Sequence, residues 1–319
     1  MSSDVFGVIS RFDAILQTAE ESAIKQIFQA LGTSYANLED TLRRSHDKYV
    51  ATAQPNLTGL QRSALLLQEI EDLLNLIPPG IAATLEPGIA ELINQASTDG
   101  SSMAKELIET IVPNTDVFPS TVPVEAVKSA VIDAMSWLTG TGIEFKTAAK
   151  QVIAQGLIQN KGIAWTTGVL RRNLGVSKRN AESIARTATL QATDKASREA
   201  YETNAINYCQ RVSAEDNRVC GFCALRCGNI YPLNEAIAII HVRCRCYLMP
   251  VKAEWIADGL IDLGWMRSHH DETVAIANSP LNPGLAQLER SRGLTRPATP
   301  VWTPSGGFQD ADFARAVGH

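Results

Sequence analysis

The most informative segment of this chain begins with Cys220-Gly221-Phe222-Cys223 and ends with His241-Val242-Arg243-Cys244-Arg245-Cys246. In the first run two residues separate two thiols, a spacing that lets both reach one ion while backbone amides of the turn point at the sulfurs. The second run adds an imidazole and two more thiols. Together they predict one structural zinc site, with ligands Cys220, Cys223, His241 and either Cys244 or Cys246.

The choice between Cys244 and Cys246 stays open in the sequence. If residues 244–246 are extended, alternate side chains share a face, so both sulfurs point one way while Arg243 and Arg245 point the other. Ligands are in excess, which favours a closed structural site over a catalytic zinc with an open position. The cysteine that does not bind zinc would pack in the core or beside the ligands.

All six cysteines of the chain lie within this part of the sequence, which favours a metal site in a reducing compartment over scattered disulfides. Cys209 and Cys227 are the weaker ligand candidates and are interpreted as buried or free thiols. The alternative centre is an iron–sulfur cluster on Cys220, Cys223 and Cys227. Because so short and loop-rich a stretch buries little apolar surface, its folding should depend on the metal.

Upstream of the cysteines, apolar residues recur at helical spacing. Helices are predicted from the start to about residue 50, with a break near Gly32, and then at about 60–76, 87–111, 124–138, 142–158, 161–172 and 177–204. Breaks between them are expected at Pro78-Pro79, at the proline-containing segment 112–123, and at Gly140 and Gly142. Ser177 is the expected N-cap of the last of these helices.

The last of these helices carries alanines along one face, which would let another helix approach closely: Ala181, Ala185, Ala188, Ala192, Ala196 and Ala200. Strands follow at 208–212 and 244–251, then a helix from 252 to about 270. The predicted fold is therefore mainly α, with a long helical region (1–120), a domain (121–275) whose zinc-stabilised α+β module spans about 205–251, and an extended proline-rich tail (276–319).

Composition restricts the classes of function. The 319 residues are 45% hydrophobic and 20% charged, with a net charge of -5, which is typical of a globular protein and argues against one that coats nucleic acid. Basic residues gather locally in segments 171–186 and 211–245, as a solvated surface or as a contact face for DNA or an acidic protein. No secretion signal or membrane-spanning segment is recognised, so a soluble, non-secreted protein without membrane contact is expected.

Known catalytic patterns are missing from the sequence. A zinc deaminase carries His-x-Glu ahead of Pro-Cys-x-x-Cys, whereas here the order is reversed and Arg243 stands where the glutamate would be. The chain also contains no His-Glu-x-x-His, phosphate-binding loop or Gly-x-Ser-x-Gly elbow. We therefore expect a protein that is not an enzyme.

The chain resembles the phage Mu F-type minor head proteins, also called phage head morphogenesis proteins, over about residues 150–250. The resemblance is carried by Ile184-Ala185-Arg186-Thr187, by Tyr201, by Asp216-Asn217-Arg218-Val219-Cys220-Gly221-Phe222-Cys223, and by the final His241-Val242-Arg243-Cys244-Arg245-Cys246. Val242 stands where the family often has proline, and Cys227 is an additional thiol. Neither departure removes a proposed ligand.

This resemblance implies a virion component present in several copies of a symmetric assembly near the portal vertex. Its implied partner is the portal protein, with the major capsid protein and genomic DNA as further contacts, and its implied role is head assembly and DNA packaging or delivery. Two rival classes remain: a zinc-containing DNA-binding protein that uses the local arginines, and a toxin-like enzyme such as a transferase or nuclease.

Overall fold

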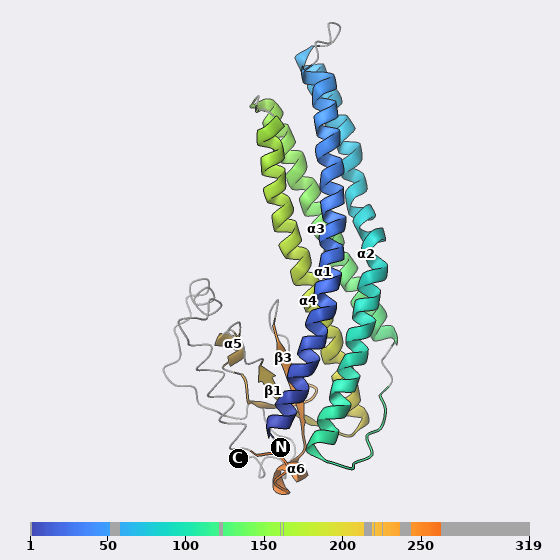
Figure 1. Cartoon of the computed structure of the whole chain (residues 1–319), viewed down its shortest axis with the longest axis vertical. Coiled ribbons are helices and arrows are strands. Elements are labelled where there is room, and N and C mark those ends of the chain that lie inside the picture. Colours follow the sequence, from blue (N-terminus) through green and yellow to red (C-terminus); the bar gives the residue numbers. More distant parts are fainter. Residues whose placement is uncertain are drawn as a thin grey trace. The chain divides into compact units, whose positions relative to one another are not determined.

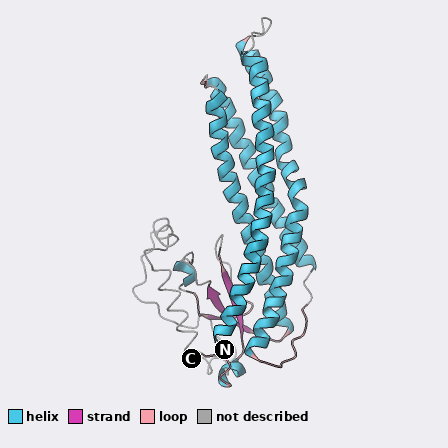
Figure 2. Cartoon of the chain, in the orientation of Figure 1, coloured by secondary structure: helices cyan, strands magenta, loops and turns pink. Residues whose placement is uncertain are grey.

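The computed structural model of this chain is mainly helical, with a small three-stranded sheet near its C-terminal end (Figures 1 and 2). It describes residues 2–51, 58–120, 124–159, 161, 163–213, 219, 221–224, 226–236 and 244–262. The predicted fold class is confirmed for this part of the chain. The predicted proline-rich tail, 276–319, lies outside the described residues.

Long helices make up most of the described chain: α1 (Ser2–His46), α2 (Gly59–Ile111), α3 (Val124–Ile158) and α4 (Ile163–Thr203). A π-helical turn (Asp47–Ala51) follows α1, and two short helices, α5 (Gly221–Ala224) and α6 (Ala253–Ala257), lie beyond α4. Within the described ranges, none of these helices has the length and apolar character needed to cross a membrane.

The sheet has the strand order β2-β1-β3, and both pairings are antiparallel. Its strands are β1 (Tyr208–Ser213), β2 (Ile230–Pro232) and β3 (Cys246–Val251). Every residue of β1 and β3 is buried, so the central strand is covered on both faces. Tyr201, near the end of α4, donates a hydrogen bond of 2.7 Å from its hydroxyl to the carbonyl of Leu248 and so attaches β3 to that helix.

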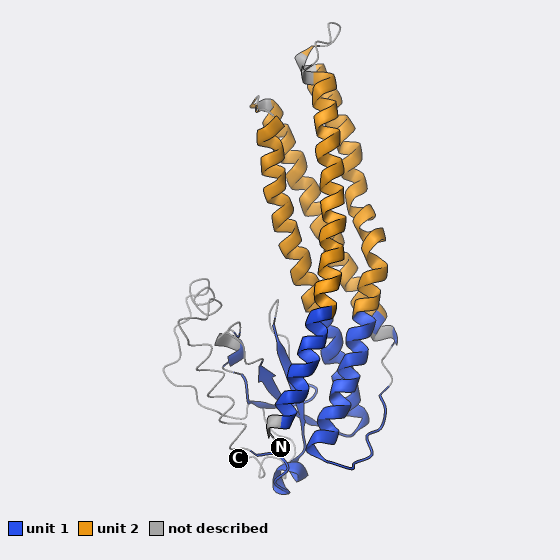
Figure 3. Cartoon of the chain, in the orientation of Figure 1, with its two compact units in different colours: residues 1–18, 93–127, 189–319 blue, residues 19–92, 128–188 orange. Residues whose placement is uncertain are grey.

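The chain divides into two compact units (Figure 3). The first comprises residues 1–18, 93–127 and 189–319, and the second comprises 19–92 and 128–188. Both units contain residues from before and after residue 120. Helices α1, α2 and α4 are each divided between the two units. The second unit is a helical bundle with buried leucine and isoleucine side chains, such as Leu38, Leu66, Ile70 and Leu74.

The prediction that Pro78-Pro79 ends a helix is wrong. Both prolines, and Pro87 after them, lie inside α2. A proline inside a helix removes a hydrogen bond, at a cost of about 3 kcal/mol. The buried face nevertheless continues through the prolines, at Leu74, Ile77, Ile81 and Leu85, and the packing of these side chains offsets the missing bonds.

The breaks predicted at Gly32 and at Gly140 and Gly142 are also absent from α1 and α3. Gly142 has a packing role instead: a Cβ there would lie 3.3 Å from the Cα of Pro78. Glycine thus lets α3 approach the proline turn of α2. By contrast, the break predicted at 112–123 is confirmed for residues 112–120, which join α2 to α3.

Helix α4 runs without a break through the position where a new helix was predicted to begin. Ser177 caps no helix: its hydroxyl donates to the carbonyl of Asn173 one turn earlier. The alanine face is confirmed as a packing surface, since all six alanines are buried. At its C-terminal half, within the first unit, Ser197 Oγ donates to the carbonyl of Gly100 on α2 at 3.0 Å.

The helix predicted from residue 252 to about 270 is much shorter. Helix α6 ends at Ala257, and Gly259, two residues later, adopts a left-handed φ of 68°. The amide of Leu260 then donates to the carbonyl of Trp255 at 2.8 Å, and the amide of Gly259 to that of Ile256 at 3.0 Å. These two bonds form a Schellman motif, which ends a helix. Residues beyond 262 lie outside the described chain.

A buried carboxylate in the first unit allows a test by pH. Asp99 on α2 accepts a hydrogen bond from Gln95 through Oδ1, and among the described residues Oδ2 has no hydrogen-bond partner. Burial raises the pKa of Asp99, although the bond from Gln95 opposes this effect. A carboxyl whose pKa is raised on folding contributes stability below its unfolded pKa of about 3.9, and loses it as the pH rises through the folded value.

Asp99→Asn should therefore raise the free energy of unfolding at pH 7 by about 1 kcal/mol, because no charge is then buried. The gain should shrink toward zero as the pH falls to about 4. Denaturant unfolding of both proteins across this pH range measures the difference. Asp72→Asn, at an exposed site on the same helix, is the control. A gain that does not depend on pH would contradict this account.

Candidate metal centre

Three buried thiols meet at the edge of the sheet. The Sγ atoms of Cys223, Cys244 and Cys246 all lie within 4.8 Å of one another, and those of Cys223 and Cys244 are 3.4 Å apart. Their side chains are no more than 3% exposed. Three thiols from two separate parts of the chain are thus gathered out of solvent, as the zinc prediction requires. We call them the three-thiol cluster.

The backbone around β1 brings these thiols together. Cys223 lies on α5, which leads into a turn where Gly228 adopts a φ of 82°. The amide of Gly228 donates to the carbonyl of Arg211, and the amide of Arg211 donates to the carbonyl of Asn229, so the turn is fixed beside β1. Cys246 starts β3 directly opposite Ser213 of β1. Cys223 therefore reaches the same sheet face as Cys246.

The predicted alternation at residues 244–246 is confirmed. The sulfurs of Cys244 and Cys246 point into the cluster, whereas Arg245 turns away and pairs with Asp13 of α1 at 2.7 Å. The hydroxyl of Tyr247 also donates to Asp13, at 2.5 Å. Both cysteines of the pair thus stand at the cluster. The other two predicted ligands, Cys220 and His241, lie outside the described residues.

Two side chains of the central strand also lie beside the thiols. Arg211 Nη2 lies 3.4 Å from Cys223 Sγ and 3.5 Å from Cys244 Sγ. Ser213 Oγ lies 3.4 Å from Cys246 Sγ and donates to the carbonyl of Cys223. Because they are two residues apart on one strand, Arg211 and Ser213 share a sheet face.

The thiols and the guanidinium affect one another's protonation. Contact with Cys223 lowers the pKa of Cys246, but contact with Cys244 and burial raise it by more, to about 12. Burial alone lowers the pKa of Arg211, and the charges of the three cysteines outweigh it, so this pKa is raised. The guanidinium stays charged, and a bound cation would have to take the place of the thiol protons.

The donor set suits zinc. With Zn–S bonds of about 2.3 Å, tetrahedral ligands place two sulfurs about 3.8 Å apart. The observed 3.4 Å between Cys223 and Cys244 and the 4.8 Å limit for the whole cluster bracket this value. An ion could bind here through small side-chain adjustments. Soft thiolates favour zinc over magnesium or calcium, which prefer oxygen ligands.

Cys209 and Cys227 are both buried and stand outside the three-thiol cluster. The thiol of Cys209 lies 3.9 Å from the carbonyl of Tyr231, and burial raises its pKa, so it stays protonated. The Sγ of Cys227 accepts a bond from the amide of Ser213. Their interpretation as buried thiols agrees with this arrangement.

The interpretation of the local basic residues as an exposed surface agrees with Arg171, Arg172 and Arg179, which are exposed, but it is wrong for three other arginines. Arg211 is 1% exposed and faces the thiols, and the side chain of Arg245 is 10% exposed in its pair with Asp13. Arg186 pairs with Glu20 and Glu182 in the second unit. Arg226 is exposed, whereas Arg218 and Arg243 lie outside the described residues. The sequence analysis did not identify Arg211 as a neighbour of the thiols. Its position inside the predicted strand 208–212 was the signal that its side chain could be buried.

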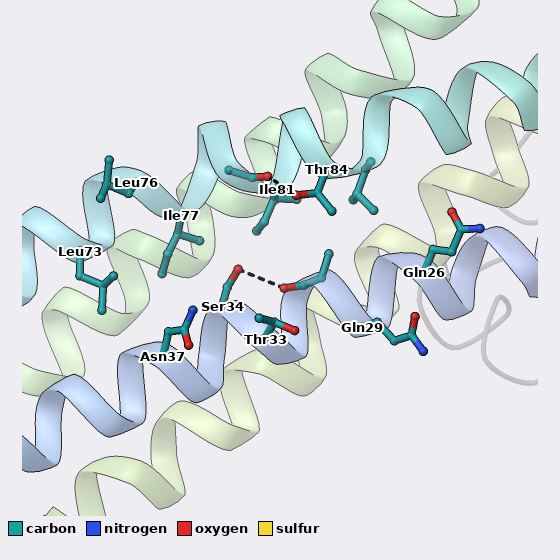
Figure 4. A pocket seen from close by; sticks show the side chains of 13 residues that line it. Gln26, Gln29, Thr33, Ser34, Asn37, Leu73, Leu76, Ile77, Ile81 and Thr84 are labelled. Carbon is teal, nitrogen blue, oxygen red and sulfur yellow. Dashed lines mark hydrogen bonds between the residues drawn. The ribbon is translucent and has the colours of Figure 1, made fainter.

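A separate pocket of about 540 Å³ lies within the second unit (Figure 4). Helix α1 lines it with polar side chains such as Gln29 and Asn37, and α2 lines it with apolar ones such as Leu73 and Ile77. No residue of its lining is ionisable. The pocket offers hydrogen bonds and apolar contacts, and it holds no pair of groups suited to acid–base chemistry.

Comparison with protein families, with curated proteins and with solved structures gives no match for this chain.

Proposed function

We propose that this chain is a structural virion protein, a phage minor head protein bound to the portal, whose sheet module is held together by zinc. The observation that supports a structural role for the zinc is that the residues of the three-thiol cluster are buried from solvent. A catalytic zinc needs an open position that substrate can reach, whereas a structural zinc is enclosed by its ligands.

The residues that carry the resemblance to minor head proteins support this proposal by their structural roles. Tyr201 attaches β3 to α4, and Cys223, Cys244 and Cys246 form the cluster beside that strand. The motif thus describes one packed module: a helix end, a sheet and a metal centre. The proposed zinc ligands are Cys220, Cys223, His241 and either Cys244 or Cys246. The long helices give the chain extended surfaces for packing against other subunits.

Binding to portal tests the proposal. The chain should form a stable complex with the portal protein of the genome that encodes it, detected by size-exclusion chromatography with mass measurement, at a salt concentration that removes nonspecific DNA binding. Terminase, portal and major capsid genes are expected beside its own. Absence of a portal complex, together with DNA binding that weakens steeply with salt, would instead identify a zinc-containing DNA-binding protein.

A further inference from the structure

The carboxylate of Asp13 joins the start of α1 to the segment that carries two of the cluster thiols. Its Oδ1 accepts hydrogen bonds from Arg245 Nη1 at 2.7 Å and from the hydroxyl of Tyr247 at 2.5 Å. Its Oδ2 accepts a bond from the side-chain amide of Gln17, one turn later on α1. The side chains of Asp13 and Arg245 are only 15% and 10% exposed, so this ion pair is largely removed from solvent.

The two partners of Asp13 on this segment are the residues on either side of Cys246. Side chains of an extended chain alternate between two sides. Here Cys244 and Cys246 point into the three-thiol cluster, whereas Arg245 points to Asp13. Because Tyr247 donates to the same carboxylate, the backbone before and after Cys246 is held from the side opposite the sulfurs. Asp13 thereby restricts the directions that the two sulfurs can take.

The burial of this ion pair gives it weight. An exposed ion pair contributes little to stability, whereas breaking a buried pair is costly, because each charge loses a close opposite charge where water does not replace it. The pair of Asp13 and Arg245 is close to the buried case. The pair of Arg11 and Glu106, which also begins on α1, is the exposed case, with side chains 52% and 38% exposed.

An ion in the three-thiol cluster would hold the same segment from its other side. When Asp13 has already ordered residues 244–247, binding an ion orders less of the chain and so costs less conformational entropy. The converse also holds, since a bound ion orders these residues for Asp13. Two such restraints on one segment favour each other, and thermodynamic linkage makes the effect equal in both directions.

We infer that Asp13 is a positioning residue of the metal centre, and that metal binding is coupled to the attachment of residues 2–18 of α1 to residues 244–251. This inference rests on the proposed zinc site. Residues 1–18 belong to the first unit together with 189–319, whereas the rest of α1 belongs to the second unit. The influence of the metal should therefore extend along α1 to about residue 18 and no further.

Zinc affinity of variants of the full chain, measured by chelator competition, tests the positioning role. Asp13→Ala should weaken zinc binding by about 10-fold, within the range of roughly 5- to 150-fold that is typical of coupled sites. Arg11→Ala is the matched control, because it removes the exposed pair with Glu106 from the same part of α1 and should leave zinc affinity unchanged.

A second background shows whether Asp13 acts through its two partners. In a chain that already carries Arg245→Met and Tyr247→Phe, the change Asp13→Ala should cause no further loss of zinc affinity. An undiminished loss in that chain would overturn the inference. Visible absorption of bound cobalt, which reports the geometry of its ligands, should change in Asp13→Ala but not in Arg11→Ala. A residue that only stabilises the fold would leave the spectrum of the loaded centre unchanged, and that result would also overturn the inference.

Hydrogen exchange of wild type gives a test that holds even if Asp13→Ala does not fold. Zinc should slow exchange at residues 5–18 of α1 as well as in β1 and β3, while residues 19–46 respond little. If zinc slows exchange in β1 and β3 but leaves residues 5–18 unchanged, the inference fails and the zinc site stands. If wild type binds no zinc at all, the proposed site fails together with this inference.

Discussion

Replacing Cys223 and Cys244 together by serine is expected to abolish binding of the proposed zinc ion and to unfold the small sheet, while the helical bundle of the second unit stays folded. The reason is that the thiols come from α5 and from the start of β3, so an ion bound to them would join these segments and its binding free energy would become folding free energy. For structural zinc this contribution reaches about 10–16 kcal/mol in small peptides. Loss of two ligands removes most of it.

Metal analysis of the dialysed protein and hydrogen exchange along the chain measure the two parts of this prediction. Zinc should fall from one ion per chain to a trace, and β1 and β3 should lose protection, while residues 19–92 and 128–188 keep theirs. Cys209→Ser is the matched control, since that thiol is equally buried but outside the cluster. Undiminished stoichiometric zinc in a Cys220/Cys223 double serine variant would rule out the site.

Gly100→Ala is expected to lower the free energy of unfolding of the first unit by about 2 kcal/mol, the usual cost of overpacking a helix contact. A methyl group at this position would lie 2.5 Å from the carbonyl oxygen of Thr193 and 2.9 Å from its Cα. Both atoms belong to the backbone of α4 and cannot rotate away. Helices α2 and α4 would have to separate, which would also strain the bonds from Thr193 to Ala96 and from Ser197 to Gly100.

The matched control is Gly7→Ala, because Gly7 also lies in a helix of the first unit and a Cβ there meets no atom within 4 Å. That change should stabilise the protein by about 0.5–1 kcal/mol, the ordinary gain of alanine over glycine in a helix. Denaturant unfolding followed by hydrogen exchange compares the two variants. The close approach of α2 and α4 is refuted if Gly100→Ala is as stable as Gly7→Ala.

Helical content was predictable from the sequence because apolar residues recur at helical spacing over long segments. Helix ends were less predictable. Pro78 and Pro79 remove backbone hydrogen bonds and Gly142 adds an entropic cost. Here the continuous burial of neighbouring residues outweighs both effects, and that burial is a property of the packed bundle. Gly259 shows the opposite case: its left-handed conformation ends α6 earlier than the apolar pattern suggested.

The candidate site, too, was only partly predictable from the sequence. Spacing alone predicted that Cys223 and one cysteine of the Cys244/Cys246 pair share a site, and the structure brings all three thiols together. The other two predicted ligands lie outside the described residues. Spacing said nothing of Arg211, which is separated from these cysteines along the chain and, judged by its charge, was expected on the surface. Only the register of β1 beside α5 and β3 shows its contact with the sulfurs.

By itself, then, the sequence determined that this chain is mainly helical, that α4 packs through an alanine face, and that several of its cysteines come together in a group that could hold a metal ion. These properties follow from local periodicity and local spacing. Tertiary structure alone decided that α2 continues through its prolines, that the helices are shared between two units, and that a buried arginine faces the thiols. Each of these depends on burial and charge balance between distant segments, which no local pattern records.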